Sequence, residues 1–238
     1  MTTRDSYLDG NLFSTAYRDE FAPDIGLRSR FDYIDESLKG MRVIHVGCVD
    51  HLPVIDKKIE SGYWVHGRVT AVAKSCQGYD INAEGIEYLQ SKHGIENIRL
   101  HDVCLGPPEE LSEDKWDVMF IGEVIEHIDN PVAFLTAIHE KWLGRVDKLV
   151  VTVPNAFRKV NFSNALKGFE LINSDHRFWF TPFTISKLVS VSGFSTSRVH
   201  FVTGFPTEKI RHPKGILERR RLKKHPALRD TLLLTADF

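Results

Sequence analysis

The alternation of two hydrophobic patterns is the feature that most constrains how this chain can fold. From Met41 onward, short apolar runs rich in β-branched residues alternate with stretches in which apolar residues recur at helical spacing. This alternation is typical of βαβ units, in which helices join parallel strands and cover the sheet. A chain of 238 residues can bury the core of one such domain and is only marginally long enough for two.

The predicted strands are short apolar runs that stop at a glycine, an acid or a proline. They cover residues 42–46, 77–81, 98–101, 116–121 and 148–153, with two late strands at 194–203 and 231–238, the last at or next to a sheet edge. Helical spacing covers residues 55–74, 83–93, 131–142 and 183–192. The sequence therefore predicts an α/β fold with a Rossmann-like, doubly wound sheet that is mostly parallel and has an antiparallel strand at its C-terminal end.

We expect a single domain, with residues 1–40 as an N-terminal helical cover over the mouth of the site and residues 41–238 as the main body. Lys and Arg number 31 and Asp and Glu 32, so the net charge of −1 draws the chain toward neither nucleic acid nor membrane. The first ten residues hold no apolar run, so we expect a cytoplasmic protein without membrane insertion. Cys48, Cys76 and Cys104 are too widely spaced to suggest a zinc knuckle or a disulfide framework, and a homodimer is left open.

The loops after the first three predicted strands carry a candidate cofactor site. In an open parallel sheet, ligands lie at the carboxyl ends of the strands. Gly47, after the first strand, lets the backbone approach a ligand closely, although a plain strand-ending turn also explains this glycine. Asp80, after the second strand, can accept hydrogen bonds from both hydroxyls of a ribose, and Asp102, after the third, can contact an adenine amino group.

These loops resemble those of class I S-adenosylmethionine (SAM)-dependent methyltransferases, and the resemblance spans residues 41–201. The first motif of that family is an apolar strand, an acid and G-x-G-x-G. Here His45 stands at the acid, Gly47 at the first glycine, Val49 at the second and His51 at the third. The resemblance implies a SAM site that also includes the turn after the fourth strand, with these residues: His45, Gly47, Cys48, Asp80, Ile81, Asp102, Val103, Gly122 and Glu123.

The segment GEVIEHIDNP, residues 122–131, carries the strongest chemical signal. Glu123, Glu126 and His127 fall at i, i+3 and i+4, which predicts two carboxylates and an imidazole on one face of a single helical turn. Such groups repel or compete unless a cation or a proton relay joins them. The alternative is an exposed helix acid at Glu126 and a packed side chain at His127.

This segment resembles the E-V-x-E-H motif of the ubiquinone-pathway O-methyltransferases and of the small-RNA terminal 2'-O-methyltransferases. The RNA enzymes add a later histidine in the context D-H-x-F-x-W-T, and SDHRFWFTP puts His176 in the matching place. The resemblance implies that Glu123, Glu126, His127 and His176 hold a divalent ion such as Mg²⁺ or Mn²⁺, which would ease the loss of a hydroxyl proton. Glu126, His127 and His176 are thus the expected catalytic residues, and without a metal His127 or His176 is the general base.

Three further segments bear on the acceptor. Residues 61–73 resemble a Trp-x-His helix of some sugar-modifying methyltransferases, in which Trp64 or His66 could touch cofactor or substrate, while core packing is the favoured role of Trp64. Residues 155–179 mix aromatic and amide side chains, a composition that suits stacking on a sugar or base and also suits packing onto the domain. Residues 210–229 are basic, either a phosphate track or a solvated helix face.

Three functions follow from these patterns. The favoured one is methyl transfer from SAM to a hydroxyl of a sugar, so the expected partner is a small-molecule or glycan acceptor such as a nucleotide sugar. The second is RNA 2'-O-methylation along residues 210–229, against which the neutral body of the protein speaks. The third is a methyltransferase-like binding or scaffold subunit whose altered glycine loop, with Val49 and His51, has lost turnover.

Overall fold

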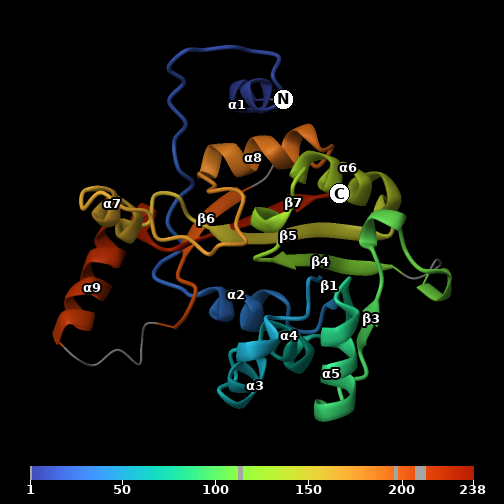
Figure 1. Ribbon diagram of the computed structural model, residues 1–238. Helices are drawn as coiled ribbons and strands as arrows, with labels where there is room; N and C mark the ends of the chain where they lie inside the picture. Colours follow the sequence, from blue (N-terminus) through green and yellow to red (C-terminus); the bar gives the residue numbers. More distant parts are fainter. Residues whose placement is uncertain (1, 112–114, 196–197, 207–212) are drawn as a thin grey trace.

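The computed structural model describes residues 2–111, 115–195, 198–206 and 213–238. In this part of the chain, a seven-stranded sheet has the order β3-β2-β1-β4-β5-β7-β6 (Figure 1). The strands are β1 (Arg42–Val46), β2 (Ser75–Asp80), β3 (Ile98–Leu100), β4 (Trp116–Gly122), β5 (Val146–Pro154), β6 (Arg198–Val202) and β7 (Thr231–Asp237). Strands β1 to β5 are parallel, and β7 runs antiparallel between β5 and β6. The predicted fold class is confirmed, and the last strand lies next to the sheet edge.

Helices cover both faces of the sheet (Figure 1). On one face lie α6 (Pro131–Trp142) and α8 (Pro182–Val191), and on the other α2 (Arg30–Ser37), α3 (Leu52–Glu60), α4 (Val65–Val72) and α5 (Ala83–His93). The remaining helices are α1 (Thr3–Leu8), α7 (Lys159–Ala165), α9 (Pro213–Lys224) and the 3₁₀ turns η1 (Val103–Leu105), η2 (Glu109–Leu111), η3 (Ile125–His127) and η4 (Pro226–Leu228). Within the described residues, every helix is too short or too polar to span a bilayer.

The central strands are apolar on both sides because both sides are covered. In β4, Met119 and Ile121 join the core beneath α6 and α8, whereas Val118 and Phe120 join the core beneath α2 and α4. A strand buried on both faces gives a continuous apolar run rather than an alternating one. Burial on both faces explains why the run WDVMFI, residues 116–121, is almost entirely apolar and predicts a strand.

Differences from the sequence-based expectations lie mainly at the ends of elements. The stretch 55–74, expected as one helix, forms two helices, α3 and α4, because Gly62 between them has a φ of +72°, a left-handed conformation that ends an α-helix. The late strand expected at 194–203 is β6, which begins at Arg198; residues 196–197 of that expectation lie outside the described residues.

The N-terminal segment is helical only at its two ends. At one end, α1 packs on α8, where Lys187 Nζ donates a hydrogen bond to the Tyr7 carbonyl oxygen at 2.9 Å. At the other end, α2 packs on α4 on the opposite face of the sheet, and its first residue, Arg30, reaches Glu123 at the carboxyl end of β4. The segment therefore lies along both faces of the sheet, and between α1 and α2 it is not helical, whereas a helical cover was expected for residues 1–40.

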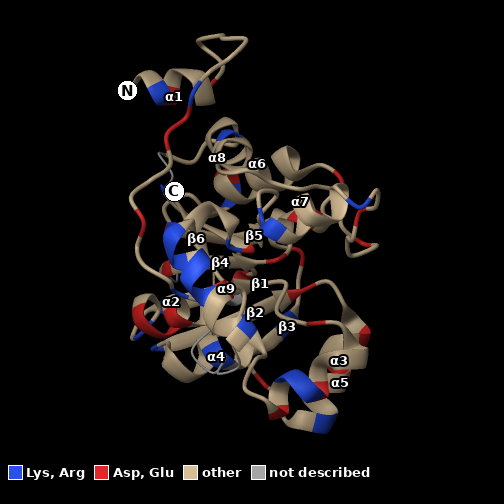
Figure 2. Cartoon of the chain, turned by 90° about the vertical axis from the view of Figure 1, so that its left-hand side faces the viewer, with Lys and Arg blue, Asp and Glu red and all other residues tan. Residues whose placement is uncertain are grey.

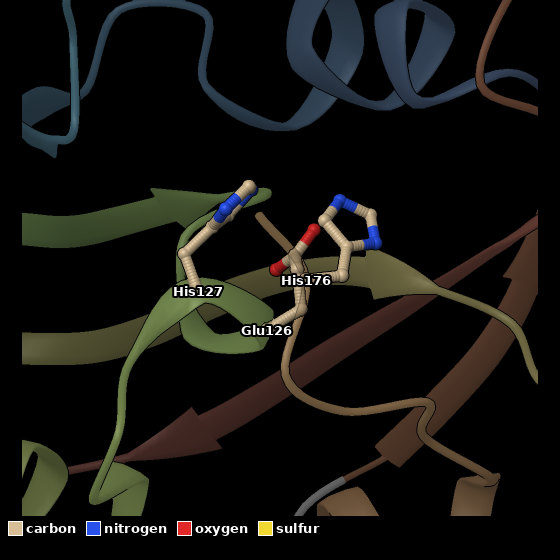
Figure 3. A group of neighbouring side chains, drawn as sticks. All are labelled: Glu126, His127 and His176. Atoms are coloured by element: carbon tan, nitrogen blue, oxygen red, sulfur yellow. The ribbon is translucent and has the colours of Figure 1, made fainter. Parts of the chain in front are cut away.

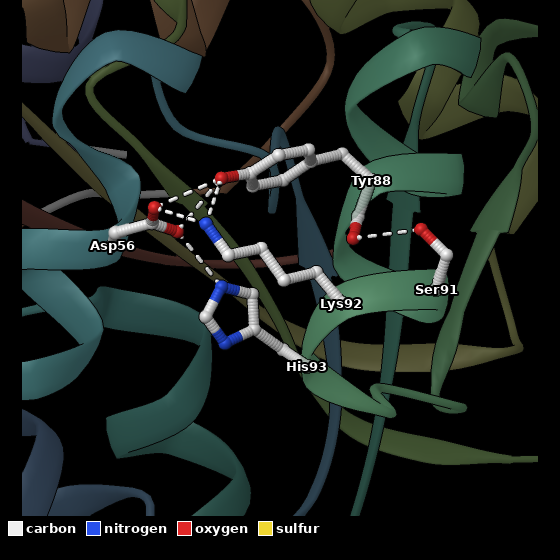
Figure 4. Close-up of polar contacts among 5 residues, drawn as sticks. All are labelled: Asp56, Tyr88, Ser91, Lys92 and His93. Atoms are coloured by element: carbon white, nitrogen blue, oxygen red, sulfur yellow. Dashed lines mark hydrogen bonds and ion pairs between the residues drawn. The ribbon is translucent and has the colours of Figure 1, made fainter.

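A polar cluster joins α3 to α5 (Figure 4). The carboxylate of Asp56 accepts a hydrogen bond from Tyr88 Oη at 2.9 Å and contacts Lys92 Nζ at 2.6 Å and His93 Nε2 at 2.8 Å. Exposed ion pairs contribute little stability. The cluster instead fixes the orientation of α3, which directly follows the loop after β1.

Two histidines stack inside the core between β1 and α4. The Nδ1 atoms of His45 and His66 are 3.1 Å apart, and both side chains are buried. Beside them, the buried Trp64 donates from Nε1 to the Cys48 carbonyl oxygen at 3.1 Å, so its expected place in the core is confirmed. Burial lowers the pKa of His66 to about 4 and holds the pKa of His45 well below its usual range.

This histidine pair predicts a loss of stability on acidification. Between pH 6.5 and about 4 the unfolded chain binds protons that the folded His66 does not, so the free energy of unfolding falls as the pH falls. At one pKa unit per 1.36 kcal/mol, His66 alone contributes roughly 3 kcal/mol of this loss. Urea unfolding at pH 7, 6 and 5 should show a shallower pH slope for His66→Gln than for the wild type. His225→Gln, at an exposed position, is the control, and equal slopes for all three proteins would contradict the prediction.

Candidate active site

The turns that follow β1 and β4 touch one another. The sheet register pairs Val46 with Ile121, so Gly47 and Gly122 begin neighbouring turns. Gly47 has a φ of +70°, and a β-carbon there would lie 2.3 Å from Cγ2 of Val124. Both turns stand where the strand order reverses, between β1 and β4, which is where open α/β sheets bind their ligands.

Asp80, at the end of β2, fixes the loop that follows β1. Its Oδ2 accepts a hydrogen bond from the Val49 backbone N–H at 2.8 Å, and its Oδ1 accepts one from the Asn82 N–H at 3.0 Å. Burial raises the pKa of this carboxyl, while those backbone hydrogen bonds oppose the shift. A carboxylate has lone pairs beyond these two. Asp80 can therefore hold the loop and still accept hydrogen bonds from a ligand.

Val49 stands at the second glycine position of the motif, and its side chain fills a space left by Gly85 of α5. A β-carbon at Gly85 would lie 2.4 Å from Cγ1 of Val49, so the missing side chain of Gly85 makes the space that Val49 fills. Val49 packs there against the apolar core between α3 and α5, which includes Ile55 and Leu89. A side chain at this motif position is thus compatible with the packing of the loop.

Three of the residues expected at the cofactor have buried side chains. Cys48 and Val103 belong to the apolar core. His45 is 2% exposed, and its ring packs against those of His66 and Phe120. His45 stands at the family's acid position, and β1 directs its side chain into the core beneath α4, so its expected place at the cofactor site stays a prediction that would have to rest on its backbone.

The other expected cofactor residues end their strands as predicted. Ile81 is exposed after β2, and Gly122 ends β4. Asp102 is exposed after β3, and its Oδ1 accepts a hydrogen bond from the Cys104 N–H at 2.9 Å, which caps η1. The carboxyl ends of β1, β2, β3 and β4 thus present four of the predicted positions along one edge of the sheet: Gly47, Asp80, Asp102 and Gly122.

The acidic, histidine-bearing turn after β4 differs from the helical turn expected there. Glu126 and His127 lie in η3, whereas Glu123 precedes it with a φ of +57°. Glu123 therefore does not share a helical face with them, and its Oε1 lies 3.6 Å from Nη1 of Arg30. A positive φ at a residue other than glycine is strained and is found most often at functional sites.

Glu126, His127 and His176 converge at one point (Figure 3). One ligand atom from each lies within 4.8 Å of the others, and the two imidazole centroids are 4.7 Å apart with perpendicular rings. The backbone N–H of Arg177 donates to the Glu126 carbonyl oxygen at 2.8 Å, which seats the segment around His176 on η3. Three of the four predicted metal ligands thus meet, and the fourth, Glu123, is paired with Arg30.

The electrostatics of this group fit a bound cation. Glu126 is 0% exposed, and neither of its carboxylate oxygens has a hydrogen-bond partner among the described residues. Burial, aided by the charge of Glu123, raises the pKa of Glu126 to about 9. Burial also lowers the pKa of His127 and of His176, which favours the neutral imidazoles that ligate metals. A buried carboxylate without a partner is costly, so this donor set suits a divalent ion with oxygen and nitrogen ligands.

Two arginines border the group and were not predicted from the sequence. Arg30 comes from α2, and Arg158 comes from the segment after β5, where its guanidinium carbon lies 4.6 Å from the ring centroid of Trp179. Trp179 in turn lies 6.3 Å from the ring centroid of His176. No local pattern marks either arginine, because each meets the site through residues distant in the chain.

The basic segment is divided in its role. Its helix, α9, holds Lys and Arg residues, coloured blue along the ribbon in Figure 2, and residues 210–212 lie outside the described part of the chain. Arg229, the last of the basic residues, is 0% exposed and donates hydrogen bonds to Asp24 Oδ1 at 2.6 Å and to the Phe201 carbonyl oxygen at 2.8 Å. Arg229 is therefore a structural residue and not part of a phosphate track.

Comparison with solved structures identifies the fold. A SAM-dependent methyltransferase from Thermotoga maritima, described as a possible histamine N-methyltransferase, aligns over 88% of this chain and 87% of its own, with 12% identity and a TM-score of 0.56. A SAM-dependent methyltransferase from Archaeoglobus fulgidus aligns over 88% and 91%, with 17% identity and a TM-score of 0.51. The small RNA methyltransferase HEN1 aligns over 93% of this chain and 27% of its own, with 16% identity and a TM-score of 0.53. The chain has the fold of SAM-dependent methyltransferases.

Searches with the sequence against protein-family models and against curated proteins find no match. Structural similarity at 12% to 17% identity establishes the fold but does not identify the methyl acceptor, because one fold serves many substrates.

The contact between the two turns predicts unequal costs for two glycine substitutions. Gly47 and Gly144 both have a left-handed backbone, with φ of +70° and +78°, but a β-carbon at Gly144 would meet nothing within 4 Å. Gly144→Ala should cost only the backbone strain, about 1–2 kcal/mol of unfolding free energy. Gly47→Ala should cost about 1–3 kcal/mol more, because the new methyl group overlaps Val124. Denaturant unfolding of both variants measures the difference, and equal losses would mean that the two turns do not pack as described.

Proposed function

We propose that this protein is a SAM-dependent O-methyltransferase that binds SAM across the turns after β1, β2 and β4. The observation that carries the proposal is the buried, unpartnered carboxylate of Glu126, which meets two imidazoles beside the Gly47 turn. The fold supports SAM as the cofactor, and this cluster supports methyl transfer to a hydroxyl oxygen. The metal is inferred from the residues of the cluster, and the acceptor is inferred from the residues around it.

In the proposed complex, the residues divide the work of binding SAM. The positive φ of Gly47 turns the backbone sharply after β1, which would let the backbone of this turn approach the cofactor closely. Asp80 accepts hydrogen bonds from the ribose hydroxyls with the lone pairs that Val49 and Asn82 leave free. Asp102 lies at the next strand end for the adenine amino group. SAM held by these residues would supply its methyl group beside η3, because the Gly47 turn touches the turn after β4.

Methyl transfer requires an aligned acceptor oxygen and a place for its proton. The acceptor oxygen attacks the methyl carbon, the carbon–sulfur bond breaks with its electron pair going to sulfur, and the hydroxyl proton leaves. Glu126, His127 and His176 would hold a divalent ion, which when bound makes the hydroxyl proton easier to remove. Alignment alone contributes up to ~7–11 kcal/mol toward such a reaction. Without a metal, His127 or His176 takes the proton as general base.

Exposed aromatic residues after β5 support a sugar acceptor. Phe157, Phe162, Phe169 and Phe178 are between 38% and 67% exposed, so packing onto the domain accounts for only part of their surface. Aromatic faces of this kind stack on the apolar faces of sugars and bases. We therefore favour the hydroxyl of a glycan or nucleotide sugar as the methyl acceptor.

RNA 2'-O-methylation is the second candidate, and α9 is the observation that favours it. Its exposed basic side chains are a possible phosphate contact surface, and the HEN1 structure with a similar fold is a small RNA methyltransferase. Against it, Arg229 is internal. Binding of single-stranded RNA measured at several salt concentrations tests this candidate: affinity that falls steeply with salt supports it, and no detectable binding removes it.

The proposal predicts that SAM stabilises the protein. At a concentration 100 times its Kd, SAM should add about 2.7 kcal/mol to the free energy of unfolding, seen as a rise in melting temperature. A binding or scaffold subunit that has lost the cofactor site, the third function considered, would show no rise.

The proposal also predicts a separation of cofactor binding from turnover. Glu126→Ala combined with His127→Ala should abolish methyl transfer and Mn²⁺ binding by calorimetry, while SAM affinity stays near that of the wild type, because the cluster lies beyond the cofactor loops. Glu140→Ala, an exposed acid on α6, is the control and should change neither. Unchanged turnover in the double variant would end the proposal for this cluster.

A further inference from the structure

Arg158 lies beside the candidate active site, and one face of its guanidinium stacks on an aromatic ring. Arg158 precedes α7, and its guanidinium carbon lies 4.6 Å from the ring centroid of Trp179. The Trp179 indole is itself fixed, because Nε1 donates to Glu170 Oε1 at 2.7 Å. Trp179 lies 6.3 Å from the ring of His176, so the guanidinium is one ring away from the catalytic cluster.

The hydrogen bonds of Arg158 orient it and leave one amino group unused. Nε donates to Asn161 Oδ1 at 2.7 Å, and Nη2 donates to the Leu171 carbonyl oxygen at 3.4 Å. Among the described residues, Nη1 has no hydrogen-bond partner and no carboxylate lies within ion-pair distance of the guanidinium. Arg158 is thus a positioned cation without a matching anion.

The surroundings of Arg158 make this lack of a partner significant. The side chain is half-buried, and burial lowers its pKa, since a cation removed from water is less stable than one in solvent. Glu123 and Asp230 act on it only as more distant charges, and Glu123 already faces Arg30. A stacked, partly desolvated guanidinium is the group best suited to bind a planar or tetrahedral oxyanion.

We propose that Arg158 binds an oxyanion carried by the acceptor, a phosphate or a carboxylate, so that the methylated sugar is an anionic one. This inference rests on the proposed function for the identity of the acceptor, but the anion site stands on its own contacts. In this arrangement the hydroxyl of the sugar would lie at the Glu126 cluster and its oxyanion at Nη1 of Arg158. A nucleotide sugar supplies the phosphate, and a uronic acid supplies the carboxylate.

The test measures binding of simple anions to the full chain without metal. Pyrophosphate and glucuronate are titrated by calorimetry into the wild type, into Arg158→Gln and into Arg177→Gln. Arg177 is the matched control, because it is an exposed arginine of the same segment, already paired with Asp129. Loss of one charged hydrogen-bonding partner corresponds to roughly ten- to hundredfold in Kd, so Arg158→Gln should weaken binding by at least that lower factor while Arg177→Gln changes it little.

Each outcome bears on the proposal. Tight binding of pyrophosphate alone points to a phosphate-bearing sugar, and of glucuronate alone to a uronic acid. Equal affinity in the wild type and Arg158→Gln, or no binding of either anion to the wild type, overturns the anion site. Glu126→Gln should leave anion binding intact, so failure of the methyltransferase proposal and failure of the anion site are told apart: the former appears as no response to SAM, the latter as no response to Arg158→Gln.

Discussion

The packing of the Gly47 turn against Val124 is the contact on which the site depends. Parallel register between β1 and β4 brings the two turns level, and the missing side chain at Gly47 lets them touch. Because they touch, the loop that would hold a cofactor and the turn that carries Glu126 and His127 form one continuous wall. Asp80 braces this wall from the side through the Val49 backbone. The chemistry proposed for the protein follows from this closeness.

Burial gives the Glu126 cluster its character. An acid at a surface turn would be solvated and charged, whereas Glu126 is enclosed by the Arg177 segment and kept from water and from hydrogen-bond donors. Its neighbours His127 and His176 are held neutral by the same exclusion of water. The surrounding fold therefore keeps together three donor groups whose charged forms are disfavoured without a counter-ion, and a bound cation would stabilise the carboxylate form of Glu126; the residues come from two separate segments of the chain.

The sequence predicted what periodicity and strand ends determine. The doubly wound, mostly parallel sheet with its antiparallel last strand could be anticipated from the apolar runs, and the grouping of Glu126, His127 and His176 was implied by the resemblance of their motifs. The direction of His45 could not, since the pattern of β1 does not say which face of the strand lies over α4. The sequence also did not predict that Arg30 pairs with Glu123 or that Arg158 lies on Trp179, because these contacts join segments that are distant in the chain.

The internal position of Arg229 ties distant segments of the chain to one another. Its guanidinium binds Asp24 and the Phe201 carbonyl oxygen of β6, while the Arg30 N–H donates to the Thr203 carbonyl oxygen. Since Arg30 also faces Glu123, the stretch from Asp24 to Arg30 links β6 to the turn after β4. Loss of the Arg229 guanidinium would therefore loosen one wall of the candidate active site, although Arg229 itself lies outside it.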